Sequence, residues 1–209
     1  MADTYYILQD GQKTGPYTSE ELIANGLEFD TQITPADSDV WENASDIPEF
    51  FYYFESKGFY FPTEDNLAGF GWRLIAYVAD SVILAYPLNF LRPLNLTEIY
   101  ERLLSNTSTQ DDMMVILKTN LFSFIIVTLY HTACEISPLQ GSLGKKIFRL
   151  VVVDADGQRL SLGRALLRNA GKFLSSLVIA IGYLSVLWDP LKQAWHDKWA
   201  KSFVLIRNR

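Results

Sequence analysis

The feature that most constrains this chain is an apolar stretch over residues 71–91 that contains both an arginine and an aspartate. It is long enough to cross a bilayer as a helix, because a spanning helix needs about 20 mostly apolar residues. In such a helix Arg73 and Asp80 share one face and lie about 10 Å apart along the axis. A charge at the bilayer centre costs about 3 kcal/mol on insertion scales, so it normally faces other helices and finds a partner. We therefore expect either an ion or proton site lined by Arg73 and Asp80, or a structural arrangement in which Arg73 reaches the headgroups and Asp80 alone is buried.

The acidic and basic residues divide the chain into two parts. Residues 1–70 contain 14 acidic and 2 basic side chains, whereas residues 71–209 contain 10 acidic and 16 basic side chains. This asymmetry predicts two domains in different surroundings, and an acidic domain is a poor candidate for binding nucleic acid. The first residues lack the basic and apolar parts of a signal peptide, which favours a cytoplasmic N-terminus.

Few residues indicate catalysis or a bound cofactor. The chain has one cysteine, Cys134, which cannot form an internal disulfide, and its two histidines lie on different segments. Gly141 and Gly144 do not have the spacing of a phosphate-binding loop. We therefore predict that the protein is not an enzyme and that it holds no cofactor and no metal.

A small module of strands and one helix is predicted at the N-terminus. Residues 5–8 and 13–17 have the pattern of two strands joined by the turn Asp10-Gly11. Thr18 stands three residues before Glu21, which is the spacing of a capping box at the start of a helix. Two more short extended pieces are expected after that helix.

The motif Gly15-Pro16-Tyr17, the capped helix after it and Trp41 resemble the bacterial GYF-like domain. The resemblance covers about residues 4–50 and implies a module that binds a proline-rich peptide or protein on an aromatic surface. Under this reading Tyr6, Tyr17 and Trp41 are the peptide-binding candidates. The alternative is that these side chains are the core of a very small domain.

An aromatic segment follows this module. Residues 49–62 contain eight aromatic side chains in 14 positions. Amphipathic aromatic side chains favour the membrane interface, so we expect this segment to lie on the bilayer surface or against the helices. The predicted organisation is a GYF-like domain over 1–50, an interfacial linker over 51–66 and a transmembrane domain over 67–209.

A second apolar helix is predicted over residues 113–134. His131 and Glu135, at its end, are four residues apart and therefore neighbours on one face. A histidine beside a carboxylate near a membrane boundary can relay protons. The alternative is an interfacial pair that only fixes the end of the helix.

The chain from residue 135 onward is basic, with 12 Lys or Arg against 5 acidic residues, which favours the cytoplasm. The third apolar segment, over 173–188, has only 16 residues and is followed by a basic tail. We expect this segment to bend back near Gly182, with both of its ends in the cytoplasm. The alternative is a single crossing that leaves the tail outside.

Two further features are predicted between the second and third apolar segments. Residues 147–153 and 159–162 are expected to pair as a β-hairpin around the turn Asp156-Gly157. A basic stripe suited to anionic lipid headgroups is expected on the helix that follows. Its members are Arg164, Arg168 and Lys172.

Three motifs accompany Arg73 and Asp80: QGSLGK at 140–145, VVVDADGQRLSLGRALLRN at 151–169 and KQAWHDK at 192–198. With these motifs, about residues 67–207 resemble the RDD family of bacterial membrane proteins, which is named after one arginine and two aspartates. Asp197 matches the second aspartate. The resemblance implies a membrane protein, and some members of the family are described as cation/proton antiporters.

The sequence thus predicts an α+β protein, with a small βα domain followed by an all-α transmembrane bundle of three apolar segments. The leading function is exchange or transport of a monovalent cation or proton across the inner membrane, with the lipid bilayer and a homo-oligomer as further expected partners. The candidate ion or proton site consists of Arg73, Asp80, Glu135, Asp197, His131 and His196. The alternative is a non-transporting scaffold that recruits a proline-rich partner.

Overall fold

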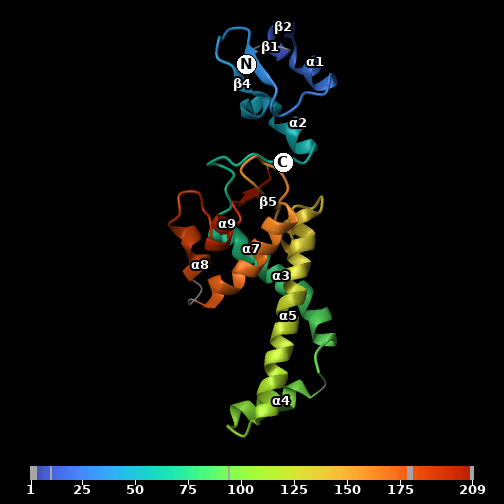
Figure 1. Cartoon of the computed structure of the whole chain (residues 1–209), viewed down its shortest axis with the longest axis vertical. Coiled ribbons are helices and arrows are strands. Elements are labelled where there is room, and N and C mark those ends of the chain that lie inside the picture. Colours follow the sequence, from blue (N-terminus) through green and yellow to red (C-terminus); the bar gives the residue numbers. More distant parts are fainter. Residues whose placement is uncertain (1–3, 10, 94, 178–180, 208–209) are drawn as a thin grey trace. The chain divides into compact units, whose positions relative to one another are not determined.

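A computed structural model describes residues 4–9, 11–93, 95–177 and 181–207 (Figure 1). The chain divides into two compact units, of which the first comprises Met1–Phe61 with Asp156–Gln158 and the second comprises the rest. The first unit contains a small sheet and the second is mostly helical, so an α+β class describes the protein.

The first unit is built on a four-stranded antiparallel sheet. Its strands are β1 (Tyr5–Gln9), β2 (Gln12–Tyr17), β3 (Gln32–Pro35) and β4 (Glu42–Asn43), in the order β2-β1-β3-β4. Helix α1 (Ser19–Ala24) begins at the predicted capping box, in which Thr18 and Glu21 each bind the other's backbone N–H. Local sequence signals were therefore sufficient to predict this part of the module.

The aromatic segment that we expected to be an interfacial linker contributes to the core of the first unit. Phe50 and Phe54 are buried together with Tyr5, and Phe59 and Phe61 pack against the same cluster. The elements here are η1 (Ala44–Asp46), η2 (Pro48–Phe50) and α2 (Phe51–Ser56). The compact unit of the structure therefore extends to Phe61, into the range that we expected to be a linker.

The second unit contains two long helices, several short helices and one two-stranded sheet. The helices include α4 between the two long ones. In chain order the elements are α3 (Phe70–Phe90), α4 (Leu96–Leu104), α5 (Gln110–Ile136), α6 (Leu143–Ile147), β5 (Leu150–Val153), α7 (Leu162–Leu177), α8 (Ile181–Leu184), η3 (Ser185–Leu187), α9 (Trp195–Trp199) and β6 (Phe203–Ile206).

Among the described residues, one helix, α5, is long and apolar enough to cross a membrane. Helix α3 has 21 residues but carries Arg73 and Asp80, and it does not meet the same test. Both helices nevertheless expose large apolar side chains, among them Val82 and Phe90 on α3 and Leu121 on α5. The described residues therefore do not form a bundle with three clear membrane spans. Both long helices nevertheless present apolar surfaces that are poorly solvated by water.

The predicted hairpin over residues 147–162 is wrong. Strand β5 pairs with β6 near the end of the chain, with Val152 opposite Val204, and residues 159–161 are not in a strand. The turn at Asp156-Gly157 was predicted correctly, but a turn signal does not identify the partner of the strand before it.

The third apolar segment doubles back on itself. A Cβ placed on Gly182 in α8 would lie 2.8 Å from Oγ of Ser175 in α7, and the Tyr183 hydroxyl donates to the carbonyl of Lys172 at 3.2 Å. A continuous helix would instead separate positions 175 and 182 by about 10 Å. The centre of this segment, residues 178–180, lies outside the described residues.

Candidate functional site

The candidate site is a network of buried charges that joins helices α3, α5, α6, α7 and α9, and Arg168 lies at its centre. The Arg168 side chain is 2% exposed. Its Nη1 pairs with Glu135 on α5, while its Nε and Nη2 donate to Oδ1 of Asp197 on α9 at 2.9 and 2.7 Å. One guanidinium thus connects two carboxylates from different helices, which is the planar, multidentate geometry that favours arginine over lysine.

Asp197 is held between two arginines. Its second oxygen, Oδ2, pairs with Arg73 from α3 and accepts the backbone N–H of Ala194 at 3.0 Å. Burial alone would raise the pKa of Asp197, but the charges of Arg168 and Arg73 outweigh it and hold the pKa well below its usual range. Asp197 is therefore an ionised acceptor at neutral pH.

Arg73 also binds two backbone carbonyls. Its Nε donates to Ala68 at 2.9 Å and its Nη2 to Lys192 at 2.6 Å. The Arg73 side chain is 14% exposed and faces protein groups, so the expectation that it reaches lipid headgroups is not supported. Its bonds instead attach the start of α3 to the segment before α9.

Glu135 is fully buried and accepts from three side chains. Besides Arg168, it is bound by Lys145 of α6 at 2.8 Å and by Nδ2 of Asn169 at 2.9 Å. We did not single out Lys145 or Asn169 as site residues from the sequence, although both lie in the quoted family motifs. No signal in the local pattern distinguishes Lys145, which points inward, from the adjacent and exposed Lys146.

Asp80 has a different set of partners from Arg73. Ser142 donates to one of its oxygens, and the backbone N–H of Gly144 (2.8 Å) and the Tyr130 hydroxyl (3.2 Å) donate to the other. The prediction that Arg73 and Asp80 together line one site therefore needs correction. They share a helix face, but Arg73 binds α9, whereas Asp80 binds the start of α6.

The two histidines are both buried. Nδ1 of His196 is 3.2 Å from the Ser175 hydroxyl, and its ring lies 5.1 Å from that of Tyr183 at an angle of 60°. Burial lowers the pKa of His196 to about 3, so this imidazole is neutral at physiological pH. His131 is also buried, and its Nδ1 has no hydrogen-bond partner among the described residues.

The predicted basic stripe on α7 does not face lipid headgroups as a unit. Arg168 is buried in the network, and Lys172 donates to Oδ1 of Asn169 at 2.6 Å. Arg164 is the exposed member, and it pairs with Asp154 at 3.3 Å. The three residues are regularly spaced, but of the three only Arg168 pairs with the buried carboxylates of Glu135 and Asp197.

The arrangement leaves little room for a bare cation. Each of the three buried carboxylates is occupied by donors, and no group of three or more His, Cys, Asp or Glu side chains that could hold a metal occurs among the described residues. A hard cation needs several free oxygens to replace its hydration shell. In this conformation, the chemistry of the network is charge pairing between helices.

The first unit carries the second candidate site, an aromatic face on its sheet. Tyr6 pairs with Thr34 across β1 and β3. Trp41 directly precedes β4, in which Glu42 pairs with Ile33 of β3. Strand β3 lies between β4 and β1, the strand that carries Tyr6.

Tyr17 has a different environment. It is opposite Tyr5 and packs against the hydrophobic core of the first unit. Its ring also borders Gly15, where an added Cβ would lie 3.3 Å from Tyr17 and 3.1 Å from Tyr6. Of the three peptide-binding candidates, Tyr6 and Tyr17 therefore both border Gly15, and Trp41 directly precedes β4.

Comparison with known proteins gives two family matches. A model described as RDD family matches residues 67–201, and one described as GYF domain 2 matches residues 5–50. The chain is 30% identical to YxaI of Bacillus subtilis (strain 168) over 148 residues, which cover 67% of this chain and 97% of YxaI. It is 33% identical over 58 residues to a proline-rich antigen of Mycobacterium leprae (strain TN), covering 27% of this chain and 23% of that protein. No solved structure matches the chain.

Proposed function

The chain belongs to the RDD family, and from this membership we propose that it is a non-enzymatic membrane adaptor whose GYF-like domain recruits a proline-rich partner. The family and the apolar helix α5 indicate a membrane-associated protein with a protein-interaction module. We further propose that the module recruits a proline-rich partner and that the buried charges hold the helices together.

The occupation of the buried carboxylates carries this proposal. Glu135 and Asp197 are both bound by Arg168, and each has a second cation of its own. Removing one member of such a buried pair leaves an uncompensated charge, at a cost of about 3–5 kcal/mol. Charges held so firmly suit a scaffold that fixes its helices better than a site that exchanges ions in every cycle.

In the proposed topology, the first unit and the basic segments after residue 135 lie in the cytoplasm. Helices α3 and α5 cross the inner membrane, and the doubled-back segment of α7 and α8 keeps its two ends on the cytoplasmic side. The excess of Lys and Arg after residue 135 supports this orientation. Modification of a cysteine placed at Lys201 by a membrane-impermeant reagent, in intact cells and after lysis, tests it.

The proposed ligand is a proline-rich segment that contacts the half-buried rings of Tyr6 and Trp41. Flat aromatic rings suit the polyproline II helix, which loses little entropy on binding. The name of the M. leprae relative, a proline-rich antigen, is compatible with a proline-rich ligand.

A peptide array probed with the full chain in nanodiscs tests this ligand class. We expect proline-rich peptides to be retained, and Trp41→Ala to reduce retention at least about tenfold, as loss of an aromatic anchor does. Tyr52→Ala is the matched control, because Tyr52 is an aromatic residue of the same unit and is 78% exposed. Equal binding by wild type and Trp41→Ala would remove the support for this surface.

One observation favours a second function, proton-coupled cation exchange. Among the described residues, Nδ1 of His131 is a buried polar atom without a hydrogen-bond partner, which is consistent with a role in proton or ligand exchange. Burial, together with the charge of Lys145, lowers the pKa of nearby Lys172 to about 7, close to the operating range of a proton carrier.

Flux measurements in proteoliposomes separate the two functions. Exchange predicts cation-dependent proton movement that Asp80→Asn abolishes while the protein remains folded. The adaptor proposal predicts no such flux in wild type, and a loss of stability, without any change in flux, in the variant. Flux from the wild-type protein would therefore overturn the adaptor as its sole function.

A further inference from the structure

We infer that a basic cavity beside the end of α5 binds a phosphate-bearing anion. The cavity measures about 320 Å³. Three of its lining residues are cations, namely Lys146, Arg149 and Arg207, and no acidic side chain lines it. It is separate from the buried network described above, which uses none of these three residues.

The fold brings these cations together from two distant parts of the chain. Lys146 is in the last turn of α6, and Arg149 follows it in the turn that enters β5. Arg207 directly follows β6, and its N–H donates to the carbonyl of Arg149 at 2.8 Å. The pairing of β5 with β6 therefore creates the cavity, and neither segment has it alone.

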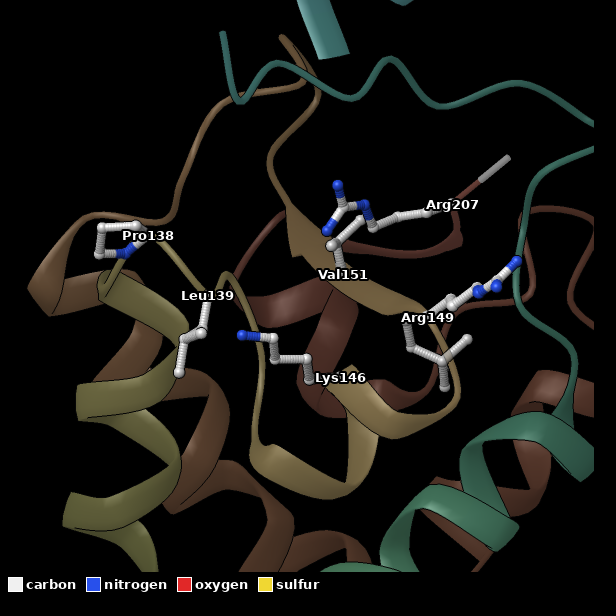
Figure 2. A pocket seen from close by; sticks show the side chains of 7 residues that line it. Pro138, Leu139, Lys146, Arg149, Val151 and Arg207 are labelled. Carbon is white, nitrogen blue, oxygen red and sulfur yellow. The ribbon is translucent and has the colours of Figure 1, made fainter. Parts of the chain in front are cut away.

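Figure 2 shows how the three cationic side chains are directed. Lys146 and Arg207 extend toward the side on which Pro138 and Leu139 lie, whereas the guanidinium of Arg149 extends the other way. Lys146 and Arg207 are therefore the expected donors to a bound anion, and Leu139 is the neighbouring apolar contact.

The charge balance of this region also favours an anion. Lys145 turns inward to Glu135, but the next residue, Lys146, is exposed, as is Arg149. Among the described residues, no ion pair engages Lys146 or Arg149. The lining of the cavity is thus cationic, which favours an anion over a cation as its ligand.

A phosphate group has the required chemistry. Its oxygens accept charge-assisted hydrogen bonds from lysine and arginine, and the apolar wall formed by Pro138, Leu139 and Val151 accommodates a hydrocarbon attached to it. The cavity starts two residues after the end of α5. The phosphate can therefore come from the headgroup of an anionic phospholipid or from a small soluble phosphate.

Native mass spectrometry of the full chain in detergent tests the site with two probes, phosphatidylglycerol and inorganic phosphate, with phosphatidylcholine as the neutral comparison. We expect wild type to retain phosphatidylglycerol in preference to phosphatidylcholine. The double variant Lys146→Gln/Arg207→Gln should lower this retention about thirtyfold, since it removes two cations near the membrane surface. Lys201→Gln is the matched control, because it removes an exposed lysine that does not line the cavity.

A second variant tests the site with all its cations in place. Leu139→Glu puts a carboxylate beside Lys146 and should also reduce retention of the lipid. Excess inorganic phosphate distinguishes the two sources: displacement of the lipid together with a higher Tm indicates a soluble phosphate, and an unchanged lipid signal indicates the headgroup. The inference fails if neither probe binds, or if Lys201→Gln weakens binding as much as the double variant. Size-exclusion profiles check that every variant is folded.

Discussion

Arg73, in the first turns of α3, pairs with Asp197 of α9, which lies 124 residues further along the chain. The pair attaches the start of the first long helix to the last short one. Asp197 also binds Arg168 of α7, and Arg168 in turn binds Glu135 of α5. These contacts therefore connect α3 and α9 to α7 and α5. One arginine–aspartate contact is thus the first link of a chain of charges that runs through the helical unit.

Replacing the central arginine should strongly destabilise the helical unit. Arg168→Gln leaves Glu135 and Asp197 each with fewer donors, and we expect a loss of about 3–5 kcal/mol. Arg164→Gln, one turn earlier on the same helix, removes an arginine that is 42% exposed and should cost less than about 1 kcal/mol. Thermal unfolding of both variants in detergent measures the difference. Similar midpoints for the two variants would contradict a central role for Arg168.

Adding one methyl group at Gly144 should separate α3 from α6. A Cβ at this position would lie 2.8 Å from the carboxylate carbon of Asp80, and it would also clash with the carbonyl of Ala76. We expect Gly144→Ala to cost at least about 3 kcal/mol, because backbone atoms cannot move aside cheaply. Gly163→Ala on α7 is the control, since nothing lies within 4 Å of its Cβ position. Helix propensity makes that substitution neutral or stabilising by up to about 1 kcal/mol.

The helical unit should lose stability in acid, in part through His196. The pKa of His196 is about 3 in the folded state against about 6.5 in the unfolded state, so below pH ~6.5 the unfolded chain takes up a proton that the folded chain does not. The free energy of unfolding should therefore fall as the pH decreases from about 6.5, by up to about 1.4 kcal/mol per pH unit. Asp197 adds to this loss below pH ~3.9. Its pKa is depressed in the folded state, so in this range the unfolded carboxylate takes up a proton while the folded one stays ionised.

Unfolding midpoints measured from pH 7.5 to 4 in wild type and in His196→Gln check this origin. In the variant, the free energy of unfolding should depend less steeply on pH, by an amount that corresponds to the uptake of about one proton fewer on unfolding. An unchanged slope would assign the acid sensitivity to other groups.

The aromatic segment after residue 50 should stabilise the first unit. Phe54 is buried in its core, so Phe54→Ala should cost about 3–5 kcal/mol. Tyr52→Ala, two residues earlier, should change stability by less than about 0.5 kcal/mol, because that side chain is 78% exposed. Hydrogen exchange of the β1 amides in the full chain reports the stability of this unit specifically. Equal protection in the two variants would restore the idea of an independent linker.

Several features could be predicted from short stretches of sequence. The capping box of Thr18 and Glu21 determines where α1 begins, and the apolar composition of residues 113–134 predicts a long helix there. The motifs around Arg73, Asp80 and Asp197 were sufficient to recognise the family. These signals are local, because capping, helix periodicity and apolar length each involve residues that are close in the chain.

The partners of the charges could not be predicted in this way. Arg73 and Asp80 share a face of α3 by sequence spacing alone, yet one binds α9 and the other binds α6. Likewise, β5 pairs with a strand near the C-terminus instead of with its neighbour after the turn.

The sequence by itself therefore determined where the two long helices lie, that Asp80, Glu135 and Asp197 are sheltered charges, and which families the two units resemble. Only the tertiary structure decided that Arg168 turns away from lipid and holds two carboxylates, and that Lys146 and Arg207 meet at one cavity. The physical reason is that a buried charge is stabilised by whichever opposite charge the packing brings within hydrogen-bond distance. That distance is set by how helices and strands far apart in the chain come together, which no local pattern encodes.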